Sequence, residues 1–277
     1  MMPISKSLAK KMLWGLGRPF HKASSWPCRV LAGPAKGCVL SLDIRSQGSY
    51  WLGSYDTWIL NRLNPISHLL ALGDTAWDCG AFVGYYTAIF RKAVGPTGHV
   101  HTFEASQRNF SNLRLLPALN NWNNVAIHHL AIGPEHCTIN FAGDLGGSSG
   151  PLDLSKSYQG TPKSETVRCS GLDELLIDYK IKPPRLIKLD LESAEEQALH
   201  NGNRLFSIHR PKVILEWHGE GVLDAISRFL EIYRYEAWDV LNYQPNEALR
   251  SKPLDPLRLH ACASEGMSNT LICIPKS

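Results

Sequence analysis

The chain has 277 residues, of which 44% are hydrophobic and 19% are charged, and its formal net charge is +4. This length and apolar content allow a full core and exclude a disordered, collagen-like or small disulfide-stapled protein. No apolar run approaches the roughly 18 residues of a membrane span, and the seven cysteines form no C-x-x-C pair, which favours reduced thiols in a cytoplasmic protein.

The positive charge is concentrated at the start of the chain. Residues 1–47 contain eight Lys and Arg side chains and a single acid, Asp43, so the remainder of the chain is mildly acidic. Such a start is typical of a solvated leader, and an arm that faces an anionic surface or substrate is the alternative.

The first seventy residues predict a small extension ahead of the main domain. Two short apolar runs, Cys28–Leu31 and Cys38–Leu42, flank a Gly-Pro turn and predict a β-hairpin. The apolar run Trp58–Leu72 predicts a helix. We expect residues 1–70 to form a leader, hairpin and lid helix over one end of a sheet built by residues 71–277.

The most regular stretch is half of a nucleotide-binding βαβ unit. Residues Thr75–Asp78 predict a strand, Cys79–Gly84 a glycine-spaced turn and Tyr85–Val94 a helix. A second strand, His99–Phe103, follows and ends at Glu104.

This unit predicts a ligand that contains a ribose. A glycine turn before a helix N-terminus lets polar atoms approach free N–H groups, and Glu104 is placed to accept both ribose hydroxyls. The spacing D-x-G-x-x-x-G from Asp78 to Gly84 lacks the dinucleotide cradle but suits a ribose with a zwitterionic tail, as in S-adenosylmethionine. Asp78 and the turn amides would then take the ammonium and carboxylate. The alternative is an ordinary turn with a surface glutamate.

Strands and helices continue to alternate after Glu104. The sequence predicts a helix over Gln107–Leu119, a strand over Val125–Ile132 and an extended piece over Thr138–Phe141. The long polar segment Gly143–Glu165 predicts a flap on the substrate side.

The second half predicts the remaining sheet. Ser193 and Glu196 have the spacing of a capping box for the helix that follows the strand Leu186–Leu191. The alternation predicts a mainly parallel α/β sheet with an antiparallel pair at one edge. The other expected elements are a short helix from Ser170-Gly171-Leu172-Asp173, a strand Pro211–Trp217, a helix Leu223–Leu230 and closing strands Glu236–Val240 and Thr270–Ile274.

An ordered set of motifs between Gly53 and Trp217 resembles the FkbM-type methyltransferases, a branch of the class I S-adenosylmethionine-dependent enzymes. The resemblance implies a Rossmann-like α/β fold, with a seven-stranded mainly parallel sheet, helices on both faces and the N-terminal hairpin and helix as an extension. The motifs are Gly53-Ser54-Tyr55-Asp56, the run Trp77–Thr87, Val94–Val100 leading to Phe103-Glu104, Asn120 before Asn124-Val125, Leu130-Ala131-Ile132, Leu172–Leu175 and Ile187–Glu195.

The resemblance also implies where the cofactor, S-adenosylmethionine, is bound. Phe82 stands where the family usually has Asn, and it removes a polar side chain beside the cofactor. Ser193 replaces a usual Gly, and we expect it to turn a flexible turn into a capped helix start. Ala105 and Asp56 replace Pro and Glu. The expected cofactor residues are Asp78, Gly80, Ala81, Gly84, Tyr85, Glu104, Ala105 and Asp56.

Methyl transfer is an in-line displacement, so a base should take the proton of an attacking hydroxyl. Asp190 is the first candidate because it ends a strand at the switch point of the sheet, and Glu192 and His218 come next. We expect no metal. The alternative is that these three residues and Glu216 bind a hard cation that orients the acceptor.

The resemblance implies O-methylation of a hydroxyl on a small molecule or glycan, such as a sugar, a polyketide or another metabolite, and we expect no nucleic acid as a partner. An RNA methyltransferase is the rival enzyme, suggested by the basic start and eight tryptophans, although the aromatic residues are scattered. A degenerate member that serves as a partner protein is the rival of another class, suggested by Phe82. The sequence leaves the oligomeric state open.

Overall fold

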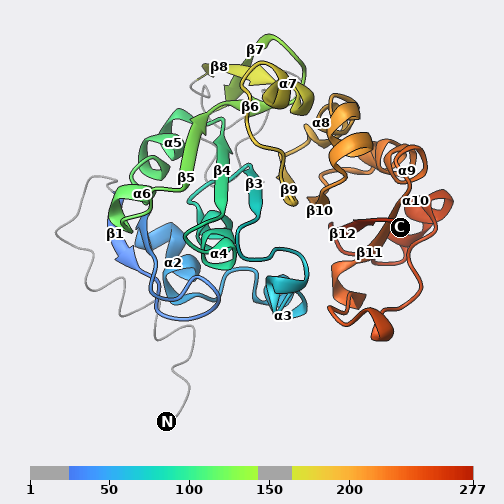
Figure 1. Ribbon diagram of the computed structural model, residues 1–277, viewed down its shortest axis with the longest axis horizontal. Coiled ribbons are helices and arrows are strands. Elements are labelled where there is room, and N and C mark those ends of the chain that lie inside the picture. Colours follow the sequence, from blue (N-terminus) through green and yellow to red (C-terminus); the bar gives the residue numbers. More distant parts are fainter. Residues whose placement is uncertain (1–24, 143–163, 277) are drawn as a thin grey trace.

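A computed structural model, described here for residues 25–142 and 164–276, is built around one seven-stranded sheet (Figure 1). The strand order is β11-β12-β10-β9-β3-β4-β5, and β12 runs antiparallel to both of its neighbours while the other pairs are parallel. This confirms the predicted α/β class and its antiparallel edge. The strands are β3 Thr75–Cys79, β4 His99–Glu104, β5 Val125–His129, β9 Leu186–Asp190, β10 Lys212–Glu216, β11 Tyr235–Asp239 and β12 Thr270–Pro275.

Helices cover both faces of this sheet, because successive strand residues point to opposite sides. On β3, Ala76 packs into the core that contains α4, whereas Trp77 and Cys79 pack into the core that contains α7, α8 and α9. The same alternation recurs along β9, β10 and β12. The helices with their bounds are α2 Ile44–Leu52, α3 Thr57–Arg62, α4 Tyr85–Val94, α5 Gln107–Leu113, α6 Leu116–Leu119, α7 Leu172–Ile177, α8 Glu195–His200, α9 Leu223–Ile232 and α10 Leu259–Ser264.

Two expected helices have other boundaries than predicted, and a proline is the cause in each case; a third helix was not predicted. The run predicted as one helix to Leu72 ends as α3 at Arg62, because the residue before Pro65 disfavours helical geometry. The helix predicted to Leu119 is split into α5 and α6, because Pro117 has no N–H to offer the carbonyl of Leu113. Helix α2 was not predicted, since Gly48 weakens its helical signal.

The predicted strand Val125–Ile132 is in fact two strands in two sheets. After β5 the chain turns at Leu130, whose N–H donates to the Glu104 carbonyl at 3.1 Å, and Ala131–Ile132 forms β6. β6 belongs to a three-stranded sheet that was not predicted, in the order β6-β8-β7, with β7 over Cys137–Ala142 and β8 over Ser164–Ser170. The end of the predicted flap is therefore strand, and its residues 143–163 lie outside the described part.

The N-terminal extension forms the predicted hairpin, β1 Trp26–Arg29 with β2 Val39–Leu42. The Asn120 side chain accepts from the Val39 N–H and donates to the Val39 carbonyl, both at 2.8 Å, and so joins β2 to the end of α6. Hairpin residues share one core with α4. The boundary at residue 70 stays a prediction.

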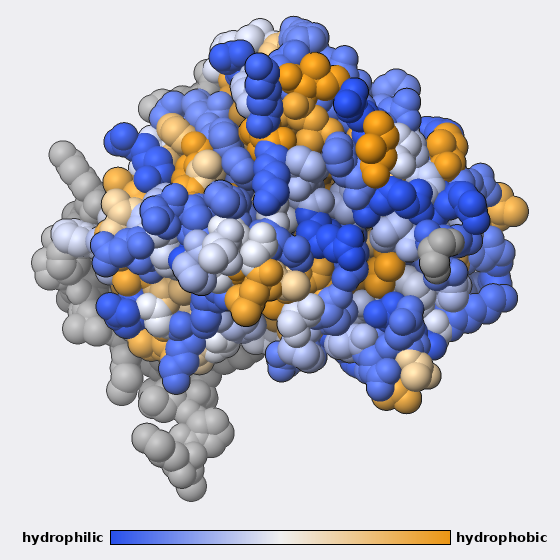
Figure 2. Space-filling view, viewed as in Figure 1, coloured by the Kyte–Doolittle hydropathy of each residue, from blue (hydrophilic) through white to orange (hydrophobic). Residues whose placement is uncertain are grey.

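The surface shown in Figure 2 carries its hydrophobic side chains in several separate groups between hydrophilic ones. Among the described residues, no helix has the length and apolar content needed to cross a membrane.

The two-sided core generates a prediction for stability. Leu189 lies at the centre of the sheet and is fully buried, so Leu189→Ala leaves a cavity and should cost about 2–5 kcal/mol of unfolding free energy. Leu257 is 82% exposed, and Leu257→Ala should change the same quantity by no more than about 0.5 kcal/mol. Urea denaturation followed by circular dichroism measures both, and equal losses would contradict the described packing.

Candidate active site

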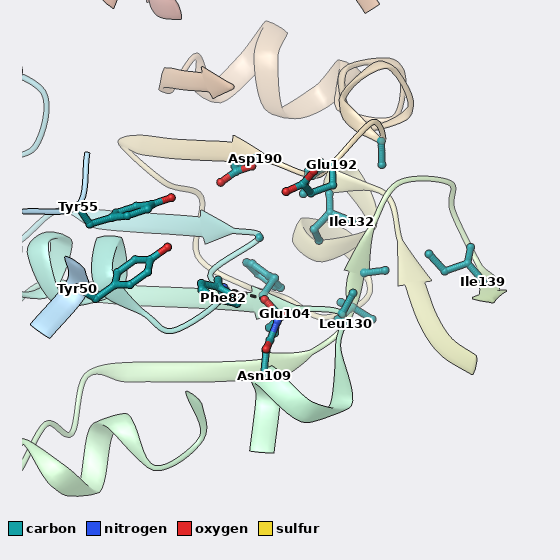
Figure 3. A pocket seen from close by; sticks show the side chains of 16 residues that line it. Tyr50, Tyr55, Phe82, Glu104, Asn109, Leu130, Ile132, Ile139, Asp190 and Glu192 are labelled. Atoms are coloured by element: carbon teal, nitrogen blue, oxygen red, sulfur yellow. Dashed lines mark hydrogen bonds between the residues drawn. The ribbon is translucent and has the colours of Figure 1, made fainter. Parts of the chain in front are cut away.

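A cavity lies at the carboxyl ends of β3, β4 and β9, where open α/β sheets place their ligands. Glu104 and Asn109 line one end together with apolar residues of the β5–β6 turn, and Tyr50 and Tyr55 of the N-terminal extension line the other (Figure 3). It encloses about 770 Å³ of empty space, including its open mouth.

The glycine turn between β3 and α4 is required by close backbone packing. Gly80 has φ +81°, and a Cβ there would lie 1.8 Å from the carbonyl oxygen of Asp190. Gly84 has φ +80°, and a Cβ there would lie 2.6 Å from the Leu113 side chain. The two glycines therefore let β9 and α5 approach the turn, and only Gly80 lines the cavity.

Several N–H groups of this turn are already used within the protein. The Gly80 and Ala81 N–H groups donate to the Phe103 carbonyl at 3.0 and 3.2 Å, and the Gly84 N–H donates to the Ala81 carbonyl. The Phe82 N–H donates to the Glu104 carboxylate at 2.8 Å. Binding of the cofactor carboxylate by amides of this turn stays a prediction. The N–H groups named above already donate hydrogen bonds within the protein.

Glu104 is buried at the end of β4 with its carboxylate on the cavity wall. Its Oε1 accepts from the Ser106 N–H at 2.9 Å and from Asn109 Nδ2 at 3.4 Å, which adds to the bond from Phe82. Burial raises the pKa of Glu104 to about 7 despite these donors. A carboxylate has about four lone-pair sites, of which these three donors leave about one, so Glu104 can still accept a hydroxyl group. This acceptor capacity and the cavity at its side fit the ribose of the expected cofactor.

Two residues that depart from the family pattern adopt a backbone conformation that the sequence did not reveal. Phe82 has φ +51° and Ser193 has φ +86°, both in the left-handed region that Asn and Gly tolerate better than other residues. The expectation that Ser193 caps α8 was wrong. Helix α8 begins after Ala194 with no side-chain cap, and the Ser193 N–H instead donates to Glu195 at 3.1 Å.

Asp78 is fully buried beneath α4 and does not line the cavity. Its Oδ2 accepts from the Thr87 hydroxyl at 2.5 Å, while its Oδ1 has no hydrogen-bond partner among the described residues. Burial raises the pKa of Asp78, and the nearby charge of Lys188 opposes this shift. Its contact with the cofactor stays a prediction.

The buried ammonium of Lys188 on β9 is linked to the N-terminal extension through Tyr86 of α4. Lys188 Nζ lies 2.6 Å from Asp190 Oδ2 and 5.0 Å from the centre of the Tyr86 ring, and the Tyr86 hydroxyl donates to Asp56 Oδ2 at 3.1 Å. Burial alone lowers the pKa of Lys188, but the charges of Asp190 and Asp78 raise it above its usual value. Lys188 is therefore a fixed cation among carboxylates.

His218 lies just beyond β10 and faces the end of β9. Its Nδ1 is 2.8 Å from Glu195 Oε1, while its Nε2 is 3.8 Å from Glu192 Oε2 and 3.9 Å from both Asp190 Oδ1 and Glu216 Oε1. Burial lowers the pKa of His218, but the hydrogen bond to Glu195 and the surrounding carboxylates raise it to about 9.

The metal hypothesis concerns the same residues. Ligand atoms of Asp190, Glu216 and His218 lie within 4.8 Å of one another. However, Lys188 already supplies a positive charge to Asp190, and Glu216 accepts from Asn269 Nδ2 at 3.0 Å. Burial raises the pKa of Glu216 to about 7. A cation at this position stays a hypothesis.

The structure thus brings part of the predicted site together. Residues that line the cavity are Gly80, Glu104, Ala105, Asp190 and Glu192, and His218 faces Asp190 and Glu192 from behind. Those that do not line it are Asp56, Asp78, Ala81, Gly84 and Tyr85.

Sequence reasoning missed the roles of several residues. Asn109 lies in the first turn of α5, shortly after Glu104, and Lys188 and Glu195 lie inside the motif around Asp190, so their positions were visible but their partners were not. Tyr55 lies in the motif from Gly53 to Asp56, but nothing in the sequence pointed to Tyr50 or to the stacking of the two rings, whose centroids are 3.9 Å apart.

Comparison with known proteins gives one family match. Residues 78–257 match the family described as the methyltransferase FkbM domain. A search of the curated proteins found no match.

Several solved structures are similar to this chain at low sequence identity. A methyltransferase FkbM from Methylobacillus flagellatus KT is 18% identical with a TM-score of 0.46, over 72% of this chain and 43% of that one. This chain thus spans less than half of that protein. A putative rRNA methylase from Clostridium thermocellum is 13% identical with a TM-score of 0.42, over 77% and 92%. Aeropyrum pernix fibrillarin, in complex with S-adenosylmethionine, is 12% identical with a TM-score of 0.40, over 74% and 68%.

The turn packing generates a prediction with a matched control. Gly37 also has a positive φ, +87°, but nothing lies within 4 Å of an added Cβ, so Gly37→Ala should cost only the left-handed penalty of about 1–2 kcal/mol. Gly80→Ala adds a clash with the Asp190 backbone and should destabilise the protein clearly more. Urea denaturation of both variants measures the difference, and equal losses would show that β9 does not press on the turn.

Proposed function

The chain belongs to the FkbM methyltransferase family, and from that membership we propose that it transfers a methyl group from S-adenosylmethionine to a hydroxyl of a small molecule or glycan. The observation that carries the proposal is one cavity lined both by a buried carboxylate, Glu104, and by two acids at the end of β9 and in the turn after it, Asp190 and Glu192.

At the Glu104 end, this chain's residues would hold the nucleoside. Glu104 accepts a ribose hydroxyl, Asn109 keeps the carboxylate oriented, and Ala105 with the apolar residues Leu130, Ala131 and Ile132 offers a dry wall for the base. The proposed cofactor set further includes Gly80 in the wall and Asp56, Asp78, Ala81, Gly84 and Tyr85 behind it. The cofactor would supply a methyl group bonded to a positively charged sulfur, and this sulfur is the leaving group when an oxygen nucleophile takes the methyl group.

At the other end, the charges favour an acceptor without negative charge. Asp190 and Glu192 line the cavity, and Glu216 lies behind them. Burial raises the pKa of Glu192, and the charges of Asp190 and Glu195 raise it further while His218 and Lys188 oppose them, so the nearby carboxylates disfavour further negative charge here. A neutral hydroxyl can donate to these carboxylates, whereas a phosphate would be repelled. This supports a small neutral acceptor over RNA, and the chain's own base is Asp190, Glu192 or His218.

The cofactor proposal is tested by isothermal titration calorimetry with S-adenosylmethionine and S-adenosylhomocysteine. Glu104→Gln removes a charged acceptor and should weaken binding about tenfold, equivalent to ~1.4 kcal/mol, since a bond to a charged group is worth about 1.5–3 kcal/mol. Glu247→Gln is the control, because the Glu247 side chain is 90% exposed and far from these contacts. A wild-type protein that is folded but binds neither compound would contradict the proposal.

The pKa of Glu104 gives this binding a pH dependence. Ribose hydroxyls donate to the ionised carboxylate, which forms as the pH rises through about 7. Affinity should therefore be highest above pH 7 and fall as the pH decreases from 7.5 to 6, and this change should disappear in Glu104→Gln. The same titration repeated across that range measures it, and an affinity that rises on acidification would refute the assignment.

The acceptor proposal is tested with a cofactor that carries a radiolabelled methyl group. We expect label in neutral sugars, polyols or phenols, and at least tenfold less in the phosphorylated form of the same acceptor, because of repulsion by Asp190 and Glu192. Transfer to RNA with no transfer to any small hydroxyl compound would favour the rival enzyme, and transfer to none would favour the partner-protein reading.

A further inference from the structure

Glu195 is the buried residue around which the turn from β9 to α8 is built. Its side chain is fully buried, its Oε1 accepts from the Leu191 N–H at 2.9 Å, and its Oε2 accepts from the Ser193 N–H at 3.1 Å. Between these donors the chain passes through two left-handed residues, Glu192 at φ +51° and Ser193 at φ +86°. The carboxylate is therefore fixed by backbone groups that do not depend on any ligand.

The remaining partner of Glu195 is His218. The distance from Glu195 Oε1 to Nδ1 is 2.8 Å, so the carboxylate accepts the Nδ1 proton and sets the tautomer of the ring. Nε2 is then turned away from Glu195 toward Asp190 Oδ1, 3.9 Å away, and Glu192 Oε2, 3.8 Å away. These distances exceed a direct hydrogen bond but match a gap that a hydroxyl oxygen, about 2.8 Å from each side, can bridge.

Asp190 is less free to move than its position at the strand end suggests. Its Oδ2 is held by Lys188 at 2.6 Å, and its Oδ1 is the oxygen that faces His218. Asp190 and Glu192 line the cavity, whereas Glu195 does not. His218 does not line the cavity either, but its side chain is 22% exposed and its Nε2 faces the two cavity acids from behind.

We propose that Glu195 is a positioning residue that holds His218 with Nδ1 protonated and Nε2 aimed at the acceptor hydroxyl, so that His218 is the base of the reaction. This assignment rests on the proposed function. As the acceptor oxygen bonds to the methyl carbon, the carbon–sulfur bond breaks with its electron pair going to sulfur. The hydroxyl proton passes to the lone pair of Nε2, and Glu195 stabilises the imidazolium that forms, as a carboxylate does for the histidine of a hydrolase triad.

The charges around His218 determine the pH above which Nε2 is unprotonated and can accept a proton. Glu195 of α8, Glu192 of the turn, Asp190 of β9 and Glu216 of β10 all face the ring and favour its protonated form, while Lys188 opposes them. The pKa of His218, raised to about 9, places the neutral base on the alkaline side. A bound cofactor with a positively charged sulfur would shift that balance toward neutral imidazole.

The pairing is tested without any acceptor by two-bond ¹H–¹⁵N correlation spectroscopy of ¹⁵N-histidine protein, with His218→Gln to assign the signal. We expect Nδ1 to stay protonated throughout and Nε2 to lose its proton with a midpoint near 9. In Glu195→Gln the proton affinity should fall at least tenfold. The control is Glu196→Gln, because neighbouring Glu196 is 51% exposed and pairs only at the surface with Arg228, and it should leave the titration unchanged.

Three results would overturn the inference: a neutral ring protonated on Nε2, an unchanged proton affinity in Glu195→Gln, or a shift of the Nε2 signal by Mg²⁺, which would make it a metal ligand. The tautomer of the wild type decides the matter even if Glu195→Gln does not fold. With an acceptor from the methyl-transfer screen, kcat/KM should rise with pH toward 9, and its midpoint should move to lower pH in Glu195→Gln.

Failure of this inference is distinguishable from failure of the proposed function. Glu195→Gln should keep its affinity for S-adenosylhomocysteine within threefold of the wild type, because Glu195 does not line the cavity. Cofactor binding with the wrong tautomer overturns the role of Glu195 and leaves the proposed function intact. A wild type that binds no cofactor overturns the proposed function, and with it the catalytic role of His218.

Discussion

The ion pair between Lys188 and Asp190 is the interaction on which the rest of the site depends. An isolated charge as buried as the Lys188 ammonium would be costly, so its 2.6 Å contact with Asp190 and the nearby Asp78 carboxylate make the arrangement tenable. Because β9 lies at the centre of the sheet between β10 and β3, this cation influences acids on three strands at once. Removing Asp190 would leave the buried ammonium with only the Asp78 and Glu216 carboxylates to offset its charge.

Close backbone packing imposes the second constraint. The carbonyl of Asp190 packs directly against Gly80, so β9 and the glycine turn are held in close contact. Residues in left-handed geometry gather around this contact, namely Phe82, Glu192 and Ser193. Such strained positions persist where their surroundings over-determine them, and here they surround a candidate catalytic centre.

The N-terminal extension contributes to the site although it precedes the residues that match the family. Tyr50 and Tyr55 line one end of the cavity, and Asp56 reaches the buried cation through Tyr86. Residues 78–257 carry the family match, so part of the cavity wall is built outside it. On the proposed function, this extension would take part in the choice of acceptor.

The sequence by itself determined the parallel α/β class, the antiparallel edge and the βαβ unit that ends at Glu104, because hydrophobic periodicity and glycine spacing are local properties. It also indicated Asp190, Glu192 and His218, since strand ends at the switch point are readable from the order of elements. Tertiary structure alone decided that Asp78 turns beneath α4, that Lys188 pairs with Asp190 and that Glu195 holds His218. It also decided that Ser193 adopts a left-handed turn. Each of these depends on contacts between strands or on a backbone angle set by distant packing, and neither is encoded in the spacing of neighbouring residues.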